Sequence, residues 1–387
     1  MKAHYLSICL SLFFISCSNQ DEENQFVQYV DVQYKYTEVY SFSEGLSLVV
    51  RDGLYGFVDK TGVEVIPCQF NSASSFKEGL ALVKKGASIS YINKNGEEVI
   101  QCAYQSASSF SNGMACVEMN GKQGFIDKSG DLVIPCSYKN TSNYNGKSVW
   151  FYDGNLWGVV DKNGTKTILG TGVQFIEEFS EGMAAIAYKQ FNEYSFGFIN
   201  QTGEFVVPSM YSKVYNYSDG LAAVRNWNGD YGYIDKKGKV VIPFQFENVG
   251  YFSEGLAWVS KPGGRYGLIN KSGDMVVPYI YDSGSSFSDG MSLVRRDDGN
   301  TLKYGFIDSE GNEVIPCQYD HAASFSDGFA SVCNGDKYGF IDKQGTIIVP
   351  IKFDRINKDL FSYGGSDFSD GAAWIRKKDS WKIVVKK

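Results

Sequence analysis

Short segments in which apolar and polar residues alternate recur along the chain, and each has the length of one β-strand. In residues 80–84 and 221–225, a small residue and a valine fall on one face, while the other face becomes charged towards the end. A period of two residues predicts half-buried strands. Residues 55–59 and 64–67 form another such pair, so we expect antiparallel sheets along most of the chain.

One phrase precedes these segments again and again: an aromatic residue, serine, an acidic residue or asparagine, glycine, and a large apolar residue. Phe42-Ser-Glu-Gly-Leu46 is the first copy, and a degraded copy surrounds Gly146. The anchor glycines are Gly45, Gly79, Gly113, Gly146, Gly182, Gly220, Gly255, Gly290, Gly328 and Gly371. Their spacing predicts a tandem array of repeats of about 35 residues each.

A second phrase follows each of the first nine anchors and predicts a tight hairpin. It reads aromatic-Gly-aromatic-Ile/Val-Asp/Asn-x-x-Gly, and its second glycine position is the sixth residue after the first in every copy. Asp59 can bond the amides of its own turn, and Gly62 can adopt the left-handed conformation that closes a type I turn with a bulge. A third, apolar phrase usually ends in proline, as at Pro67, where we expect the strand to end because proline cannot donate to a central ladder.

Each repeat is therefore predicted to hold a three-stranded meander and a longer return segment. The return segment carries aromatic residues six apart, such as Phe70 and Phe76, with Ala73 midway. This spacing fits a 3₁₀-like turn that fills the core between neighbouring repeats, and an irregular loop would serve equally well.

These phrases resemble those of the WG-repeat (KWG-type) proteins of bacteria. Trp157-Gly158 shows the Trp-Gly pair literally, and tyrosine usually replaces the tryptophan elsewhere. The resemblance covers about residues 40 to 387 and implies little biochemistry. The departures are Ser90 in place of the glycine, the degraded anchor near Gly146, and a final copy, Trp381-Lys382, that lacks the glycine and fits a terminal cap.

The expected fold is all-β, with the repeats of residues 36–387 stacked as an open curved or superhelical array. Propellers usually have about four to eight blades of four strands, with about 40 or more residues in each blade. About ten shorter units with three clear strands favour the open stack. A β-propeller is the alternative.

The amino-terminal residues indicate export and lipidation. Lys2 precedes an apolar run, residues 6–15, that is too short to span a bilayer. Residues 14–17, Phe-Ile-Ser-Cys, resemble the lipobox of bacterial lipoproteins. The resemblance implies a signal peptide over residues 1–16 and acylation of Cys17, which would attach the protein to a membrane. A plain secretory signal cleaved near Ser18 is the alternative.

Residues 17–35 are typical of a polar, acidic tether. The stretch after Cys17 resembles the acidic export signal that Bacteroidota place behind the lipid-bearing cysteine. This resemblance implies an outer-membrane lipoprotein on the cell surface, and the periplasmic face is the alternative.

Composition and charge exclude several classes of function. With 37 basic and 44 acidic residues and no basic cluster, we expect no nucleic-acid partner. His321 is the one histidine outside the signal peptide, so neither a catalytic triad nor a usual zinc site is expected. We expect no enzyme activity, no cofactor and no metal, and a glycoside hydrolase is the enzymatic alternative because carboxylates abound.

Four cysteines occupy one equivalent position of the repeat: Cys68, Cys102, Cys136 and Cys317. Neighbouring copies should lie about 10–14 Å apart, whereas a disulfide needs Cα atoms within about 7 Å. Buried free thiols are therefore expected, with disulfides as the alternative. Cys116 and Cys333 have no such register, so their state is left open.

Insertions concentrate in the hairpin loop that follows each anchor glycine, and such a loop-bearing edge often carries function. The expanded loops span residues 189–194 and 296–303, and residues 226–230 hold a tryptophan. We expect a rim that binds a protein or glycan ligand through Phe191, Tyr194 and Trp227, with neutral loop drift as the alternative. The expected function is a lipid-anchored binding or scaffolding protein of the cell envelope, or else a structural spacer.

Overall fold

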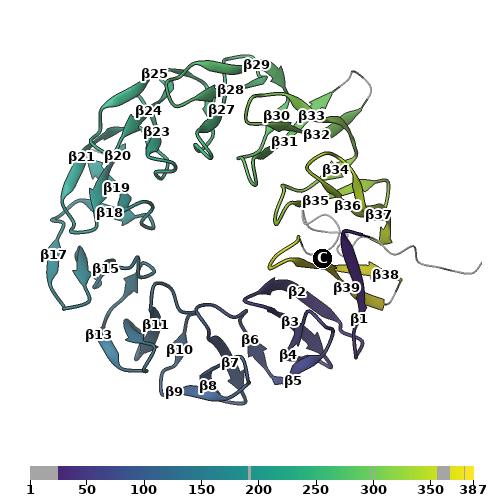
Figure 1. The fold of residues 1–387 in the computed structure, drawn as a ribbon. Helices are drawn as coiled ribbons and strands as arrows, with labels where there is room; N and C mark the ends of the chain where they lie inside the picture. The colour runs from purple at the N-terminus through teal and green to yellow at the C-terminus, as the bar shows by residue number, and fades with distance from the viewer. Residues whose placement is uncertain (1–24, 191–192, 298, 300, 355–366, 379) are drawn as a thin grey trace, which may run out of the picture.

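The computed structural model describes residues 25–190, 193–297, 299, 301–354, 367–378 and 380–387. All regular elements in this part of the chain are β-strands, and they form nine four-stranded sheets and one three-stranded sheet. The ten sheets stand in a ring as the blades of a propeller (Figure 1). The all-β repeats are thus confirmed. Their arrangement is the propeller that was the alternative, and the open array that we favoured is corrected because the ring closes.

Blades 1 to 9 follow one another along the chain and share one strand order. The first strands of these blades are β2 (Glu38–Ser43), β6 (Ser72–Ala73), β10 (Ser106–Ala107), β14 (Asn140–Thr141), β18 (Val173–Ile176), β22 (Lys213–Val214), β26 (Asn248–Val249), β30 (Ser283–Gly284) and β34 (His321–Ala322). The second strands are β3 (Leu46–Arg51), β7 (Ala81–Lys85), β11 (Met114–Met119), β15 (Ser148–Tyr152), β19 (Met183–Gln190), β23 (Leu221–Arg225), β27 (Leu256–Ser260), β31 (Met291–Asp297) and β35 (Phe329–Asn334).

The third and fourth strands complete each blade towards the outside of the ring. The third strands are β4 (Leu54–Asp59), β8 (Ser88–Ile92), β12 (Lys122–Asp127), β16 (Trp157–Asp161), β20 (Glu193–Asn200), β24 (Tyr231–Asp235), β28 (Tyr266–Asn270), β32 (Leu302–Asp308) and β36 (Lys337–Asp342). The fourth strands are β5 (Glu64–Phe70), β9 (Glu98–Cys102), β13 (Leu132–Tyr138), β17 (Lys166–Ile168), β21 (Phe205–Tyr211), β25 (Val240–Phe246), β29 (Met275–Tyr281), β33 (Glu313–Tyr319) and β37 (Ile347–Asp354). Figure 1 shows fourth strands such as β9, β13 and β25 at the outer edge.

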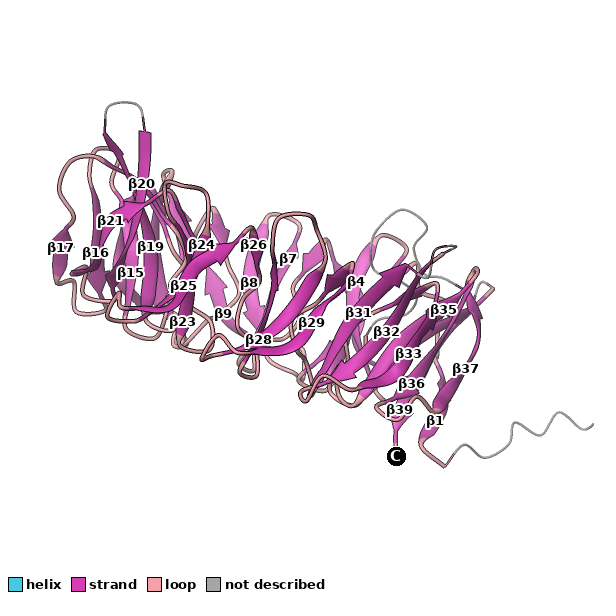
Figure 2. Cartoon of the chain, turned by 90° about the horizontal axis from the view of Figure 1, so that it is seen from above, coloured by secondary structure: helices cyan, strands magenta, loops and turns pink. Residues whose placement is uncertain are grey.

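Because neighbouring strands of a blade are antiparallel, the loops gather on two opposite faces of the ring. The connections from first to second strand and from third to fourth strand lie on one face, which we call the turn face. The connections from second to third strand, and those from one blade to the next, lie on the other face, which we call the rim face. In Figure 2 the turn face points down, where the C-terminus is marked, and the rim face points up.

The turn between the third and fourth strands has the predicted geometry. Asp59 Oδ1 accepts hydrogen bonds from the amides of Thr61 (2.9 Å) and Val63 (3.1 Å), and Gly62 has a φ of 82°. The same pair of hydrogen bonds forms at the other eight Asp or Asn positions. The prediction of a side-chain-capped turn closed by glycine is confirmed.

The glycine of the aromatic-Gly pair makes room for a bulge in the fourth strand. A Cβ atom on Gly124 would lie 2.4 Å from the carbonyl oxygen of Ile134 and 2.6 Å from the amide nitrogen of Cys136. The register of β12 against β13 shifts at this point, around Pro135. The prediction that the proline ends its strand is wrong, because β13 continues to Tyr138. The proline is accepted since the fourth strand is an edge strand with a bulge.

Blade 2 explains the departure at Ser90. Here Gln101 stands in the position of the proline, and it pairs directly with Ser90 in a regular part of the ladder between β8 and β9. Without the bulge, the third strand has room for a side chain. The glycine and the proline occur together in blades 1, 3 and 5 to 9, whereas blade 4 keeps Gly158 with Leu169 in the place of the proline and a regular ladder.

The return segment forms a short inner strand and an aromatic plug, not a 3₁₀ turn. Phe76 is buried, and its ring centroid lies 4.8 Å from that of Phe57 in the preceding blade. The same contact recurs between later blades, for example at 4.8 Å between Tyr91 and Phe110. The predicted role of filling the core between neighbours is confirmed.

Blade 10 joins the two ends of the chain. β38 (Ala372–Lys377) pairs with β39 (Ser380–Lys386), which pairs in turn with β1 (Val27–Asp31). The sequence placed residues 17–35 in a tether and left the last repeat as a cap. The structure differs because residues 27–31 alternate as a strand does and supply the outer edge that this repeat lacks.

Blade 10 also packs against blade 1. Trp374 of β38 is fully buried, and its ring stacks on that of Phe42 with centroids 5.9 Å apart. The indole Nε1 donates hydrogen bonds to the carbonyl oxygen of Tyr40 (3.1 Å) and to the hydroxyl of Ser47 (2.9 Å). These partners lie 334 and 327 residues away in the sequence, so the contact closes the ring.

A latch of hydrogen bonds links the blades on the turn face. The acidic residue of an anchor phrase accepts a hydrogen bond from the amide of the anchor glycine in the next blade, as from Gly79 to Glu44 (2.9 Å). The same bond joins Gly113 to Glu78, Gly220 to Glu181, Gly255 to Asp219, Gly290 to Glu254, Gly328 to Asp289, and Gly371 to Asp327. Gly45 of blade 1 donates to Asp370 of blade 10 (2.7 Å), so the latch also spans the closure.

Lysines reinforce several latches. Their ion pairs are Lys94 with Glu44, Lys128 with Glu78, Lys236 with Glu181, and Lys271 with Asp219. In each pair, the lysine follows the capping Asp or Asn in the turn of the next blade. The hydrogen bond from Lys271 lowers the pKa of the Asp219 carboxyl below its usual value.

Candidate functional site

The structure describes two of the four residues that the sequence singled out. Cys17 and Phe191 lie outside the described residues. Tyr194 and Trp227 lie on the rim face, in the hairpins of the neighbouring blades 5 and 6. The two hairpins therefore open on the same side of the ring.

Trp227 is held by a tight turn and exposes most of its side chain. Asn226 accepts hydrogen bonds from the amide of Gly229 at its carbonyl oxygen (3.2 Å) and from the amide of Asp230 at its Oδ1 (2.9 Å). The Trp227 Nε1 donates to the carbonyl oxygen of Met210 (2.9 Å). The indole is thus fixed by its N–H edge while 57% of the residue is exposed.

Met210, whose carbonyl oxygen accepts the hydrogen bond from Trp227, is a third exposed residue of these two blades. It lies in β21, the strand next to β20, which carries Tyr194. Met210 is 55% exposed and Tyr194 is 44% exposed. We call Tyr194, Met210 and Trp227 the rim surface. The sequence missed Met210 because it occupies an ordinary position in a strand phrase, and only the bond from Trp227 marks it.

Two cations border the rim surface. The Nζ atom of Lys189 lies 5.6 Å from the ring centroid of Tyr194. Arg225 donates from Nε to the carbonyl oxygen of Gly229 (2.9 Å), within the turn that holds Trp227. The surface therefore combines exposed apolar area with positive charge at its edge, a composition suited to recognition by contact.

The other rim hairpins differ from these two. Residues 51–54, 85–88, 119–121, 153–156, 261–265 and 334–337 connect second and third strands in other blades, and these described loops hold no aromatic residue. The exposed aromatic side chains of the described rim hairpins thus gather at blades 5 and 6.

Groups that could perform chemistry are sparse in the described residues. No set of three or more His, Cys, Asp or Glu side chains in that part of the chain could hold a metal ion. His321 lies in β34, and its ring packs 5.8 Å from that of Tyr304.

The described cysteines are free thiols. Cys68, Cys102, Cys116, Cys136, Cys317 and Cys333 form no disulfide. Burial raises the pKa of the Cys68 and Cys317 thiols to about 11, and the neighbouring Glu64 and Glu313 act in the same direction. The expected free thiols are observed, but of the four equivalent cysteines only Cys102 is buried, and Cys68, Cys136 and Cys317 are half-buried. No helix in the described part of the chain is long and apolar enough to cross a membrane.

The model of the WG-containing repeat matches residues 32–55, 55–87, 89–122, 124–150, 196–229, 231–265, 266–299, 304–338 and 338–381. The chain belongs to the family of proteins built from WG-containing repeats. The WG repeats cover most of the ring, and the matches leave out residues 151–195. This gap spans the outer strands of blade 4 and the first strands of blade 5.

Solved structures also match this WG-repeat chain. The eukaryotic initiation factor matches with a TM-score of 0.51 over 84% of this chain and 94% of that chain, at 11% identity. BamB from Moraxella catarrhalis matches with a TM-score of 0.34 over 93% and 100%, at 11% identity. The WD40 domain of SCAP from fission yeast matches with a TM-score of 0.35 over 93% and 98%, at 10% identity. At such identities the likeness concerns the fold alone, and no curated protein matches the chain.

Proposed function

We propose that this protein is a lipid-anchored scaffold of the cell envelope that holds a protein partner on its rim surface. The observation that carries the proposal is Trp227, which is fixed at its N–H edge yet 57% exposed. A large side chain in a fixed orientation loses little conformational freedom on binding, and tryptophan is among the residues that dominate binding energy at interfaces. A repeat ring that offers broad surfaces without a reactive cluster suits binding better than catalysis.

The position of the amino terminus fits an anchored scaffold. The amide of Lys387 donates to the carbonyl oxygen of Phe26 (3.0 Å), so the chain enters the ring next to the C-terminus, on the turn face. The nine residues from Cys17 to Gln25 can span at most about 32 Å. A lipid on Cys17 would thus tether the ring from the turn face and leave the rim face free. We place the protein in the outer membrane, at the cell surface, with the periplasmic face as the alternative.

A glycan is the second candidate ligand, and one observation favours it. The exposed indole of Trp227, together with the ring of Tyr194, offers aromatic faces on which a sugar ring could stack. We regard a protein as the first candidate because Met210 extends the surface with a flexible apolar side chain, which suits protein contacts.

The test compares wild type with the double variant Tyr194→Ala/Trp227→Ala in a binding assay against envelope proteins and against purified envelope glycans. Removing a central tryptophan typically costs at least about 2 kcal/mol, so the double variant should bind its ligand about 30-fold more weakly or worse. Retention of an envelope protein supports the first candidate, and retention of a glycan alone replaces it by the second.

Phe205→Ala is the matched control. Phe205 lies in the same blade and is 45% exposed, but it begins β21 and therefore lies towards the turn face. It should leave binding unchanged. Equal binding by wild type and the double variant would contradict the assignment of the ligand to the rim surface.

A further inference from the structure

The seam between blades 4 and 5 lacks the latch that joins other blades. In blade 4 the anchor turn spans residues 145–148, and Asn145 Oδ1 accepts hydrogen bonds from the amides of Lys147 (2.9 Å) and Ser148 (3.0 Å). Gly146, with a φ of 91°, stands where other blades carry Glu, Asp or Asn at a φ between 51° and 56°. Lys147 stands in the position of the anchor glycine, so the assignment of Gly146 as an anchor glycine from the sequence is wrong by one residue. At the latch position, blade 4 therefore has no side chain to accept a hydrogen bond from the amide of Gly182 in blade 5.

The lysine of the latch is missing from this seam as well. Where Lys94, Lys128 and Lys236 pair with a latch acid, blade 5 carries Gln201. Other hydrogen bonds hold this seam: the Ser148 hydroxyl donates to the carbonyl oxygen of Gln201 (2.7 Å), and the Trp150 Nε1 donates to that of Glu177 (3.0 Å). The amide of Asn143 donates to the Glu178 carboxylate (3.2 Å), away from the anchor turn. Both charged members of the latch are thus absent at one place. This place borders residues 151–195, which the WG-repeat matches leave out.

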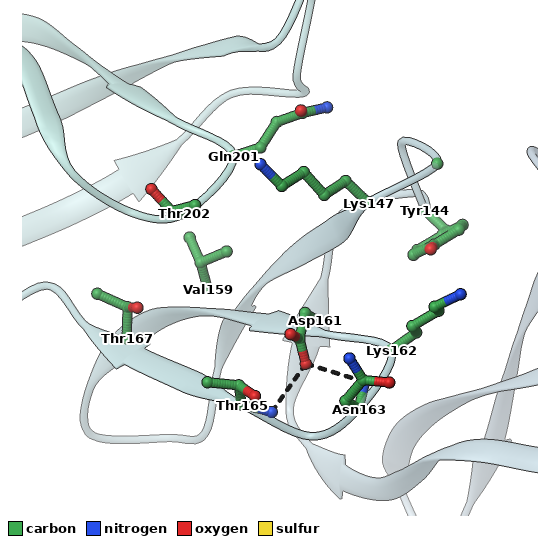
Figure 3. Close-up of a pocket in the computed structure, with 11 residues that line it drawn as sticks. Tyr144, Lys147, Val159, Asp161, Lys162, Asn163, Thr165, Thr167, Gln201 and Thr202 are labelled. Carbon is green, nitrogen blue, oxygen red and sulfur yellow. Dashed lines mark hydrogen bonds between the residues drawn. The ribbon is translucent and has the colours of Figure 1, made fainter.

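A pocket of about 320 Å³ opens where the acid is missing. Its wall includes Tyr144, Gly146, Lys147, Asp161, Lys162 and Gln201. Figure 3 shows the Lys147 side chain extended across the pocket towards Gln201, with Lys162 at the other end beyond Tyr144. A volume of this size is within the usual range for small-ligand sites.

Two lysines and one carboxylate, Asp161, line the pocket, so its net charge is positive. Neither Lys147 nor Lys162 has an ion-pair partner among the residues that the structure describes. At the preceding seam, Lys162 faces a blade whose latch position holds the neutral Asn112. Asp161 is the acidic residue of the wall, and its Oδ1 already accepts hydrogen bonds from the amides of Asn163 and Thr165.

A polar donor beside the pocket is also unsatisfied. The buried Nδ2 of Asn145 has no hydrogen-bond partner among the described residues. Asn145 lies between two residues of the pocket wall, Tyr144 and Gly146. Buried donors without partners are uncommon in folded proteins and call for an explanation such as a ligand.

We propose that this pocket binds a carboxylate, which takes the place that Glu44, Glu78 and Glu181 occupy at other seams. The ammonium group of Lys147, the carboxamide of Gln201 and the amide of Gly182 supply the donors there. Lys162 meets a second acidic group of the same ligand at the other end of the pocket. At this seam, the ligand supplies the carboxylate that a side chain of the protein supplies at other seams. The pocket lies on the turn face, opposite to the rim surface.

Calorimetric titration at fixed ionic strength tests this site, with glutarate as a free diacid and acetyl-Glu-Glu-amide as a model of acidic side chains in a protein. Glutaramide is the uncharged control probe. Wild type should bind at least one acidic probe and should not bind glutaramide. Binding of the dipeptide alone assigns the site to a protein segment, and binding of glutarate alone assigns it to a small acid.

Variants of one residue each separate the site from general charge. Lys147→Met should raise the Kd for the acidic probe at least tenfold. Lys139→Met, which removes an exposed lysine of blade 4 outside the pocket wall, should change it less than twofold. No binding of either acid by wild type, or equal binding by Lys147→Met, would overturn the proposal.

A second readout does not depend on a ligand. Gly146→Glu should restore the acid of the latch from within, because a Cβ atom on Gly146 meets nothing closer than 3.7 Å. The φ of 91° strains any side chain at this position, so Gly146→Gln, which carries the same strain, is the reference. Gly146→Glu should melt at a higher temperature than Gly146→Gln at pH 7, and the difference should vanish at pH 3, where the glutamate is protonated. Equal melting temperatures at pH 7 would contradict the proposed place of the acid.

Discussion

Replacing Trp374 by alanine should lower the free energy of unfolding as much as the same change at Trp258, the equivalent residue between two consecutive blades. Trp374 is fully buried at the junction of blade 10 with blade 1, and its indole N–H bonds Tyr40 and Ser47. Truncation of a buried tryptophan to alanine costs about 3–5 kcal/mol, and loss of the N–H leaves buried acceptors without a donor. We expect a loss of about 4 kcal/mol in the free energy of unfolding.

Trp258 offers a matched comparison inside the ring. It occupies the equivalent position in blade 7, and its Nε1 donates to the carbonyl oxygen of Ser285 (2.9 Å) and the hydroxyl of Ser292 (3.0 Å) in blade 8. It is 4% exposed. Trp258→Ala should therefore cost a similar amount, although its partners lie only 27 and 34 residues away.

Urea unfolding followed by far-ultraviolet circular dichroism measures both variants without relying on the fluorescence of the removed residue. Trp374→Phe keeps most of the apolar contact and loses the two hydrogen bonds, so it should cost about 1–2 kcal/mol. If Trp374→Ala lay within about 1 kcal/mol of wild type while Trp258→Ala showed the full loss, the ring would be open between blades 10 and 1.

Three further outcomes follow from the turns, the latch and the thiols. Gly124→Ala should lower the free energy of unfolding by about 3 kcal/mol, because its Cβ would lie 2.4 Å from a backbone oxygen. Ser90→Ala, in the blade without the bulge, should change it by less than about 1 kcal/mol, and denaturant titrations measure both variants. The pKa of Asp219 is lowered in the folded protein, so its contribution to stability is present above about pH 4 and is lost as the pH falls through the folded pKa. Asp219→Asn should therefore make the free energy of unfolding depend less on pH in the acid range. With a pKa raised to about 11, the Cys68 and Cys317 thiols should react with iodoacetamide at pH 8 about two hundred-fold more slowly than a free thiol of pKa about 8.5, and rates close to the free thiol would show that they are not buried.

The local parts of this fold could be predicted from the sequence because their causes are local. An Asp and a Gly three residues apart define a capped turn without help from the rest of the chain, as at Asp59 and Gly62. The recurring phrases also identified the repeat and its family. The bulge at Pro135 was missed because the edge position of the fourth strand becomes visible only in the assembled sheet.

Ring closure could not be predicted because it depends on the angle between blades, which accumulates over ten units. A small change in that angle separates a closed ring from an open superhelix, and no single repeat encodes the sum. The role of β1 was hidden for the same reason, since its partner β39 lies at the other end of the chain. The acids of the anchor phrases were recognised as a pattern, but their partner Gly79 or Gly113 belongs to the next blade.

The candidate site was predicted in part. Loop length and residue type indicated Tyr194 and Trp227, and both lie exposed on the rim face. Met210 and the pocket beside Gly146 could be found only in the assembled structure. Met210 is marked by a hydrogen bond from Trp227 in the next blade, and the pocket lies where the hydrogen bond of the latch is absent.

Site-specific photo-crosslinking in intact cells tests most directly that the rim surface holds a protein partner. A photoreactive residue at Trp227 is compared with the same residue at Ala87, exposed on the rim face of blade 2, and at Ser129, exposed on the turn face of blade 3. The proposal predicts one discrete crosslinked envelope protein from position 227 and none from positions 87 and 129. No crosslinked protein at 227, or the same yield at all three positions, would contradict it.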